Sequence, residues 1–414
     1  MNMLNDTALT SFKKTRFNRV ASINSKVGRD INRAIILNTI RTHQPVSRTD
    51  ISRMTGLNKS TVSSIVNHLI EQNLISEDIN RNSEVGRNPL NLWIKKDSHF
   101  VGAIYFDSLK TELAVFDIDG TIKIKTDIKT EASNALQFIA SCIDLLDELR
   151  SKSGVTVLDG IGITVAGIVD SLQSKVIYAP NLGWEDLDLG TLFRERFPTI
   201  EIITVENDAK ATALAELSFG KRKINSSNFV YLSIGPGIGA GIIIDDHILG
   251  GSSHAAGEFG HVSIIDNGEQ CTCGNKGCLE VYASDRATVR RYAASKGLPP
   301  EQASKLFLED VIIAANVGDN DAKTALMDSA NYIGIGIANI VRSFDPETII
   351  IGGTITQVWD QVYPEIMKTV NERGFFGKQR NTKILPTSLE GNPPLFGAGA
   401  LSIRKIFLDY KLSQ

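Results

Sequence analysis

The pattern of apolar and polar positions changes near residue 97, and the part before it predicts a small helical domain. Between Val62 and Ile70 apolar side chains recur every three or four positions, which predicts a helix with one buried stripe. Asn58 suits the N-cap of that helix, and Gly56 suits the tight turn before it. The other faces carry small polar residues, so we expect them to face a ligand or solvent.

Two further helices are predicted ahead of that turn. Asp30 is expected to cap the first, a run over residues 31–43. A shorter helix ending at Thr55 should begin at Ser47, with Asp50 as the capping-box partner. The inward face of the first helix is expected to include Ile31, Ala34, Ile35 and Leu37.

A β-ribbon is predicted after the third helix. Strand-like segments at 74–75 and 90–94 flank a polar tip that contains Arg81, Gly86 and Arg87. Two short helices joined by a glycine turn and followed by such a ribbon are typical of a winged helix-turn-helix, which reads DNA in the major groove. An arginine at the tip suits the narrow minor groove. A small three-helix domain that binds protein is the alternative.

The distribution of charge agrees with a DNA-binding front. The chain of 414 residues has a net charge of −3, yet residues 1–96 carry 15 Lys and Arg against 7 Asp and Glu, and the remainder carries 29 against 40. A basic front on an acidic body favours a polyanionic partner, although a solvated basic face would give the same counts. The expected DNA contacts are Arg48, Asn58, Lys59, Ser60, Thr61, Ser63, Ser64, Asn67, Arg81, Gly86 and Arg87.

From Phe100 onward strands alternate with helices, which predicts an α/β fold. The pattern predicts paired strands that turn at Asp119–Gly120, an amphipathic helix over 134–150, and a strand followed by a helix over 201–216. A second unit contains glycines 235–241 between two strand-like runs. Such a loop predicts a hairpin, because a dinucleotide-binding loop must open a helix.

Three of the four cysteines lie within eight residues, which favours a metal site over a disulfide scaffold. With His261, the residues Cys271, Cys273 and Cys278 offer one imidazole and three thiolates. This is the ligand set of a closed tetrahedral zinc site with a structural role, and we expect one zinc ion per chain. Unligated thiols in a glycine-rich loop are the alternative.

Carboxylates surround this cluster in the sequence. Glu258 lies three residues before His261, and Glu280 closely follows the last cysteine. If zinc holds one imidazole nitrogen, the other becomes a donor of fixed direction, and the carboxylates can accept hydrogen bonds from sugar hydroxyls. Asn207 and Asp208 stand at a strand-to-helix junction, where helix capping is the simpler interpretation. The alternative is contact with hydroxyls, with Asp208 as a general base.

Together these motifs resemble the ROK family, which contains both bacterial sugar kinases and sugar-controlled repressors. The most specific match is Glu-Phe-Gly-His at 258–261, followed by Cys-x-Cys-Gly-x-x-Gly-Cys-x-Glu at 271–280. The helix-turn-helix resembles the xylose-repressor branch of that family. The resemblance implies a two-lobed, actin- or hexokinase-like (ribonuclease H-like) body. It also implies sugar contacts by Gly167, Asn207, Asp208, Glu258, His261 and Glu280.

One departure separates this chain from the kinases of the family, which carry an Asp-x-Gly-Gly-Thr-Lys loop for ATP phosphates. Here Tyr105 stands at the Asp position, Asp107-Ser-Leu stands at Gly-Gly-Thr, and only Lys110 matches. Side chains and a carboxylate in place of bare backbone oppose phosphate binding. Pro236 also removes a backbone donor from the second glycine loop. We therefore expect neither ATP binding nor kinase activity, with Asp208 as a vestigial base.

The sequence predicts a cytoplasmic transcriptional repressor of carbohydrate-utilisation genes, tuned by a sugar. The expected partners are a palindromic double-stranded DNA operator, a monosaccharide or small sugar effector, and further copies of the chain as a homodimer or dimer of dimers, without a membrane. The expected domains are a basic arm (1–29), the winged helix (30–97), a first lobe (98–222) to which 395–414 return, and a second lobe with the zinc site (223–394).

Two rival functions stay open at this point. One is an active ATP-dependent sugar kinase with an appended DNA-binding domain. The other is a repressor controlled by a phosphotransfer protein instead of a free sugar.

Overall fold

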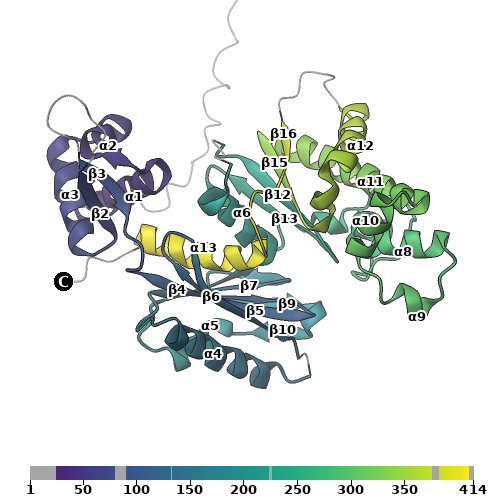
Figure 1. Ribbon diagram of the computed structural model, residues 1–414, viewed down its shortest axis with the longest axis horizontal. Coiled ribbons are helices and arrows are strands. Elements are labelled where there is room, and N and C mark those ends of the chain that lie inside the picture. Colours follow the sequence, from purple (N-terminus) through teal and green to yellow (C-terminus); the bar gives the residue numbers. More distant parts are fainter. Residues whose placement is uncertain (1–24, 80–89, 132, 223–225, 375–381, 410–414) are drawn as a thin grey trace, which may run out of the picture. The chain divides into compact units, whose positions relative to one another are not determined.

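The computed structural model describes residues 25–79, 90–131, 133–222, 226–374 and 382–409 (Figure 1). They divide into two compact units, with the boundary between Ile94 and Lys95, and the second unit reaches Ile406. Among these described residues, no helix has both the length and the apolar character that crossing a bilayer requires.

The first unit has the winged-helix arrangement that the sequence predicts. Its strands form one sheet in the order β1-β3-β2, in which β3 is antiparallel to both neighbours. The elements in chain order are α1 (Ser25–His43), β1 (Val46–Ser47), α2 (Arg48–Thr55), α3 (Lys59–Glu71), β2 (Ile75–Ile79) and β3 (Leu90–Ile94).

The capping residues predicted for α2 and α3 are confirmed. Ser47 caps α2 and shares a capping box with Asp50, and Gly56 ends the helix in the left-handed conformation at φ 71°. Asn58 caps α3 by accepting a hydrogen bond from the backbone N–H of Thr61. The predicted wing tip, with Arg81, Gly86 and Arg87, and residues 1–24 of the predicted basic arm lie outside the described residues.

The predictions for α1 were wrong in two respects. The helix begins at Ser25, so Asp30 lies inside it and does not cap it, and residues 25–29 belong to the helix instead of the arm. Ile31 and Ile35 are 49% and 41% exposed. Four consecutive apolar residues, 34–37, surround the helix, so periodicity did not decide which face is buried. The buried side chains are Arg33, Ile36, Leu37 and Ile40.

The second unit is built on two five-stranded sheets of the same topology. Each has three successive antiparallel strands followed by two parallel ones, in the orders β6-β5-β4-β7-β11 and β14-β13-β12-β15-β16. This repeated order confirms the predicted two-lobed, actin-like body. The strands of the first sheet are β4 (Phe100–Phe106), β5 (Lys110–Asp117), β6 (Ile122–Lys129), β7 (Gly160–Val165) and β11 (Ile202–Asn207). Those of the second are β12 (Phe229–Ile234), β13 (Ile238–Ile244), β14 (His247–Ile248), β15 (Thr348–Gly352) and β16 (Lys383–Pro386).

The glycine loop 235–237 joins β12 to β13, which are antiparallel, so the predicted hairpin is confirmed. The hairpin β5-β6 also turns at the predicted Asp119–Gly120, where Gly120 has φ 91°. A small sheet in the order β10-β9-β8 extends the first lobe. Its strands are β8 (Ile168–Asp170), β9 (Lys175–Ala179) and β10 (Trp184–Leu187).

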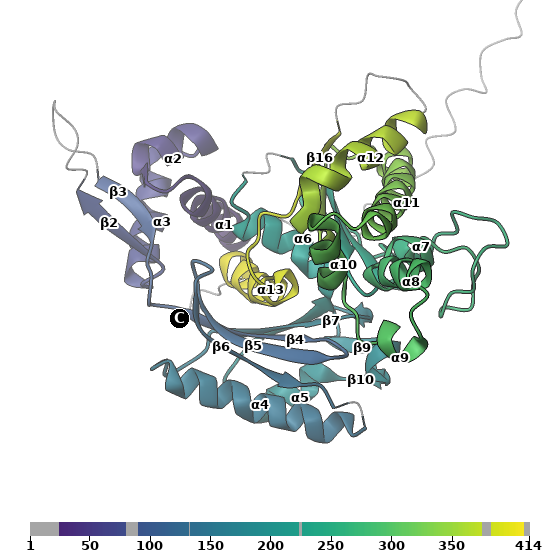
Figure 2. The same ribbon diagram turned by 45° about the vertical axis from the view of Figure 1, so that its right-hand side comes forward.

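Helices cover both sheets, and α6 (Asp208–Phe219) and α13 (Pro393–Asp409) lie between the sheets. α4 (Ala135–Lys152) and α5 (Leu189–Arg196) pack on one face of the first sheet, and α13 lies on the other (Figures 1 and 2). α6 and α13 share an apolar cluster with β12, β13 and β15. A Cβ at Gly241 of β13 would lie 2.3 Å from the carbonyl oxygen of Ala209, so this glycine lets α6 pack closely.

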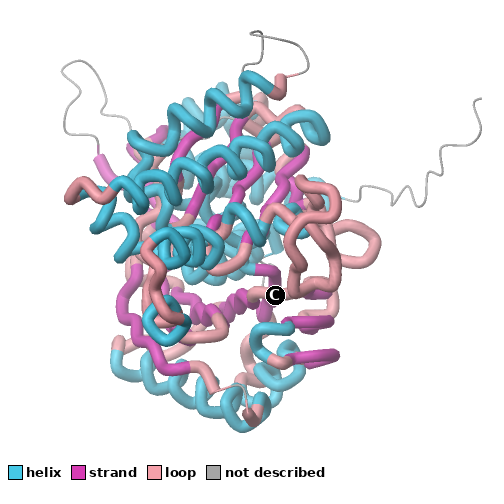
Figure 3. The backbone as a smooth tube through the Cα atoms, turned by 90° about the vertical axis from the view of Figure 1, so that its right-hand side faces the viewer, coloured by secondary structure: helices cyan, strands magenta, loops and turns pink. Residues whose placement is uncertain are grey.

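The outer face of the second lobe is helical (Figure 3). The core of the second lobe includes Leu232, Ile337 and Ile351, all fully buried. The helices are α7 (Glu280–Ala283), α8 (Asp285–Ser295), α9 (Pro300–Ala303), α10 (Leu308–Asn316), α11 (Asn320–Phe344) and α12 (Trp359–Glu372). Because α6 starts where β11 ends, the predicted Asn207 and Asp208 stand at the junction of the two lobes.

Candidate zinc, sugar and DNA sites

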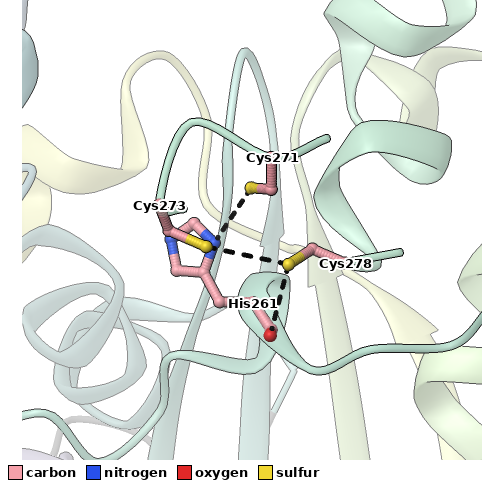
Figure 4. Close-up of side chains that lie close together, drawn as sticks. All are labelled: His261, Cys271, Cys273 and Cys278. Atoms are coloured by element: carbon pink, nitrogen blue, oxygen red, sulfur yellow. Dashed lines mark hydrogen bonds between the residues drawn. The ribbon is translucent and has the colours of Figure 1, made fainter. Parts of the chain in front are cut away.

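His261 and the three clustered cysteines form one compact group of donor atoms (Figure 4). His261 ends a short 3-10 helix, and the cysteines follow it in a loop. The four donor atoms lie within 4.8 Å of one another. Nδ1 of His261 is 3.6 Å from Sγ of Cys271, and Sγ of Cys273 is 3.7 Å from Sγ of Cys278.

These separations match the edges of a zinc tetrahedron. Zn–S bonds of about 2.3 Å and Zn–N bonds of about 2.0 Å give edges of about 3.8 Å between two sulfurs and about 3.5 Å between sulfur and nitrogen. The four side chains therefore fit zinc, which would cross-link the loop to the 3-10 helix. The loop itself depends on Gly277, which has φ 73° and whose added Cβ would lie 1.7 Å from the Ile265 carbonyl oxygen.

The other imidazole nitrogen of His261 faces a carboxylate. Nε2 lies 3.9 Å from Oε2 of Glu258. Burial raises the pKa of Glu258, His261 and Lys210 oppose that rise, and Glu280 adds to it. Two of the predicted sugar ligands, Glu258 and Glu280, are thus close enough to interact electrostatically. Nδ1 of the ring therefore lies against the cysteine cluster, and Nε2 lies toward Glu258.

Glu280 is held by the glycine hairpin. It is the first residue of α7, and its Oε2 accepts a hydrogen bond of 2.9 Å from the backbone N–H of Ile238. A Cβ at Gly237 would lie 2.8 Å from the same oxygen. The hairpin that resembles a phosphate cradle therefore positions a predicted sugar ligand instead.

Asn207 acts as a helix cap, which was the simpler interpretation of its position. Its Oδ1 accepts a hydrogen bond from the N–H of Lys210, and its Nδ2 donates one of 3.0 Å to the carbonyl oxygen of Gly167. An amide has two donor hydrogens and two acceptor lone pairs, so one of each is left for a ligand. A Cβ at Gly167 would lie 2.6 Å from the Tyr178 carbonyl oxygen, so only glycine fits there.

Asp208 lies near the strand position that differs from the kinases. Burial raises the pKa of Asp208 to about 7, and the charges of Asp107 and Glu258 add to the rise. Burial also raises the pKa of Tyr105 well above its usual value, with further contributions from Asp208 and Asp107. Asp208 is therefore close enough to Glu258, Asp107 and Tyr105 to interact with them electrostatically.

Sequence reasoning missed a buried lysine beside these acids. Lys210 is 3% exposed, and its Nζ donates a hydrogen bond of 2.7 Å to the carbonyl oxygen of His254. Nε2 of His254 lies 3.6 Å from Oδ2 of Asp170. The buried Glu206 interacts electrostatically with both Lys210 and His254. A lysine within an Ala-rich segment directly after Asn207-Asp208 was the available signal.

Sequence reasoning also missed Asp285, which lies beside the glycine hairpin. Its backbone N–H donates a hydrogen bond of 2.9 Å to the carbonyl oxygen of Gly235. Its Oδ1 is buried without a hydrogen-bond partner among the described residues. Burial raises the pKa of Asp285 to about 7, and the charge of Glu309 contributes. The carboxyl thus stands at the N-terminus of α8, which is the end of a helix that attracts anions.

In the first unit, the predicted DNA-contact residues of α3 lie on one side of the helix. Lys59, Ser60, Ser64 and Asn67 are exposed, while Thr61 and Ser63 are half-buried. Asn58 uses its Oδ1 for the N–H of Thr61 and the hydroxyl of Ser60. These positions face away from the buried stripe Val62, Ile65, Val66 and Leu69.

Arg48 has a different environment from the residues of α3. Its Nε and Nη2 donate to the two carboxylate oxygens of Glu77 at 2.8 and 2.9 Å, and its Nη1 donates to Oδ1 of Asn67 at 2.8 Å. This two-pronged ion pair joins α2 to β2, and the third bond joins α2 to α3. The guanidinium of Arg48 therefore makes its hydrogen bonds to other residues of the same domain.

Comparison with known proteins covers both units. A family model described as ROK family matches residues 102–405, and one described as MarR family matches residues 28–83. The chain is 35% identical over 386 residues to the xylose repressor of Bacillus spizizenii, covering 92% of this chain and 96% of that protein.

Two solved structures are also similar. One is a ROK family transcriptional regulator described as a homologue of the Escherichia coli MLC protein, with a TM-score of 0.78 at 28% identity, covering 92% of this chain and 97% of its own. The other is a ROK family glucokinase from Streptomyces griseus in complex with glucose and AMPPNP, with a TM-score of 0.63 at 28% identity. It covers 73% of this chain and 99% of its own.

Proposed function

Because this chain belongs to the ROK family and carries a MarR-type domain ahead of the family's body, we propose that it is a transcriptional repressor of carbohydrate-utilisation genes. The body binds a sugar, and the bound sugar tunes the affinity of the winged helix for its operator. Such a protein works in the cytoplasm, beside the DNA that it controls. A homodimer on a palindromic operator satisfies the two-fold geometry of winged-helix readers.

The exposed face of α3 is the proposed reading surface. Its short polar side chains, which include Ser60, Ser64 and Asn67, let the helix backbone approach base edges and phosphates in the major groove. Arg48 contributes by fixing α2 and α3 against β2, since all three of its donor groups are engaged inside the domain.

The proposed sugar site combines the acids at the junction of the lobes. Asp208, Glu258 and Glu280 accept hydrogen bonds from hydroxyls, and Nε2 of His261 exchanges one with the same ligand. Asn207 offers its spare donor and acceptor beside Gly167. The support for this grouping is the electrostatic interaction among the acids and the contact of 3.9 Å between His261 and Glu258.

A zinc ion held by His261 and the three cysteines would have a structural role in this proposal. It would supply a fixed orientation for the imidazole ring, because a metal at Nδ1 leaves Nε2 as the only free nitrogen. Nε2 then carries the proton and donates toward Glu258 or the sugar.

We further propose that the body does not bind ATP or transfer phosphate. Tyr105 on β4 and Asp107 directly after that strand stand at positions of the loop that holds phosphate in the family's kinases. Asp285 places a carboxyl with a buried oxygen at the N-terminus of α8 beside the glycine hairpin. The ionised form of that carboxyl repels the anion that a helix N-terminus would otherwise attract.

The observation that carries the proposal is that one chain joins a winged helix to a sugar-kinase-like body. In that body, acids lie at the two loops that correspond to the phosphate-binding loops of the family's kinases. A sugar releases the repressor only if it binds more tightly to the conformation that does not fit DNA, and such couplings amount to about 1–3 kcal/mol. Repressors of this kind thus respond to their sugar by about a 5- to 150-fold change in operator affinity.

The test is a titration of unlabelled pentoses, hexoses and amino sugars against the full-length protein bound to fluorescent duplexes from the DNA flanking its gene. One sugar should lower the affinity within that range. A protein that ignores every sugar, or that binds no duplex, would contradict the proposal. Turnover of ATP with any hexose at ordinary kinase rates of about 1–100 s⁻¹ would favour the kinase instead.

A further inference from the structure

A groove of about 1050 Å³ runs between α1 and α3 of the first unit. Four residues of α1, from Gly28 to Arg33, form one wall, and α3 forms the other. The α3 wall includes Ser60, Ser64 and Asn67, which are part of the proposed reading surface. Whatever molecule lies against that surface of α3 therefore also faces the first turns of α1.

The dimensions of a DNA duplex agree with this arrangement. The major groove is about 12 Å wide, and a helix with its side chains has a diameter of about 10–12 Å. A helix inside that groove therefore has a phosphate strand on each side. A second helix packed beside it has its axis about 8–10 Å away, which places it next to one of those strands.

The chemistry of the α1 wall suits phosphate. Arg29 is exposed and forms no ion pair with another described residue, whereas Arg33 is 3% exposed and bonds to Gln72. Asn32 adds an amide to the same wall. The first turn of α1 contains no acidic residue, so no side chain of that turn opposes the partial positive charge of the helix start. The one acid in the groove lining is Glu71, which belongs to the α3 wall.

The lining also argues against an apolar peptide or a second copy of the chain in this groove. Ile65 is the one lining residue with a hydrophobic side chain, and it is 7% exposed. Specific protein interfaces depend on a buried apolar or aromatic centre, which these walls do not offer.

We propose that α1 forms part of the DNA-binding surface, with Arg29 and Asn32 contacting the phosphate backbone beside the major groove that α3 enters. This inference rests on the proposed DNA-binding function and adds a second helix to it. Arg29 neutralises one phosphate, and Asn32 donates a neutral hydrogen bond to the same strand. Both contacts strengthen binding to any duplex and carry no sequence information.

The test compares Arg29→Ala with Arg41→Ala in the full-length protein. Arg41 is the matched control, because it lies on the same helix and does not line the groove. Affinities for the operator and for an unrelated duplex are measured by fluorescence anisotropy between 0.05 and about 0.3 M salt, a range that exposes the salt slope. Sedimentation velocity reports the oligomeric state of each variant.

One lost phosphate contact should reduce the slope of log affinity against log salt by about 0.9 and weaken binding about eightfold at about 0.1 M salt. Arg29→Ala should show both effects equally on the two duplexes, and Arg41→Ala neither. Asn32→Ala should weaken binding without a change in slope.

Three results would overturn the inference while leaving the proposed function intact. The first is that Arg29→Ala binds both duplexes with wild-type affinity. The second is that Arg29→Ala loses affinity for the operator alone. The third is that Arg29→Ala no longer forms dimers, which would assign the groove to a second copy of the chain. If the unaltered protein binds no duplex at all, the proposed function fails and this inference fails with it.

Discussion

Nε2 of His261 lies 3.9 Å from Oε2 of Glu258, while Nδ1 of the same ring lies 3.6 Å from a cysteine sulfur. The ring therefore links the cysteine cluster to the acids of the proposed sugar site. With zinc bound to both the ring and the cysteines, a movement of the cysteine loop would change the direction of Nε2 toward Glu258. Two predictions follow from this link.

The first concerns the metal. Protein purified without chelator should contain about one zinc ion per chain, because the four donors already match a zinc tetrahedron. Cys273→Ser should lower the zinc content and weaken sugar binding together, as measured by elemental analysis and calorimetry. Cys142→Ala is the control, since Cys142 is a buried free cysteine outside the cluster. Unchanged sugar affinity in zinc-depleted Cys273→Ser would contradict the link.

The second concerns Glu258 itself. Replacing it with Gln keeps the shape but removes the charge that His261 and Lys210 stabilise. A lost hydrogen bond to a charged group costs about 1.5–3 kcal/mol, so sugar affinity should fall about 10- to 150-fold. Operator binding without sugar should stay at the wild-type level. Glu301→Gln, on the exposed face of α9, is the control. If Glu258→Gln responds normally to the sugar, Glu258 does not bind it.

Several features of the fold and of the site could be predicted from the sequence, because interactions between residues close together in the chain determine them. The capping box of Ser47 and Asp50, the left-handed Gly56 and the cysteine spacing depend on neighbours in sequence. The buried face of α1 could not be predicted, because apolar residues surround that helix and only packing selects Ile36 over Ile35. Asp285 was missed for a similar reason, since only the fold brings it to Gly235, fifty residues earlier.

The ion pair between Arg48 and Glu77 makes it possible to test whether Arg48 positions the helices or contacts DNA itself. If Arg48 acts through its ion pair with Glu77, then Arg48→Ala and Glu77→Gln should both loosen the joint between α2 and β2 and weaken operator binding by similar factors. If Arg48 binds DNA directly, Glu77→Gln should free it and leave affinity unchanged or higher. Anisotropy with both variants and the double variant measures this. Additive losses in the double variant would contradict the positioning role.

Asp285 predicts a pH dependence of stability. Its pKa is 3.8 in a free chain and about 7 in the folded protein, so the folded state keeps a proton that the unfolded state loses between those values. Its contribution to stability is therefore lost as pH rises from about 4 to about 7 and is constant above that. Asp285→Asn lacks this effect.

The variant should consequently match the wild type near pH 4 and exceed it increasingly up to pH 7, by about 2–4 kcal/mol at most, given about 1.4 kcal/mol per pKa unit. Thermal midpoints at several pH values measure the difference. A gap between the two proteins that is the same at pH 5 and pH 8 would show that Asp285 ionises normally.

The glycine hairpin offers the most selective test of the sugar site. A Cβ at Gly237 would lie 2.8 Å from Oε2 of Glu280, the oxygen that accepts the hydrogen bond from Ile238. The end of a glutamate side chain can move, so Gly237→Ala should displace the carboxylate and leave the fold intact. Gly250→Ala is the matched control, because nothing lies within 4 Å of its added Cβ.

If the hairpin works as the support of Glu280, Gly237→Ala should weaken sugar binding several-fold in calorimetry, while its thermal midpoint and its sugar-free operator affinity stay at the wild-type values. Gly250→Ala should change none of these. A loss of thermal stability equal to the loss of affinity would mean that the glycine serves packing. An unchanged sugar affinity would mean that Glu280 makes no contact with the ligand, and the proposed sugar site would then contain only the carboxylates of Asp208 and Glu258.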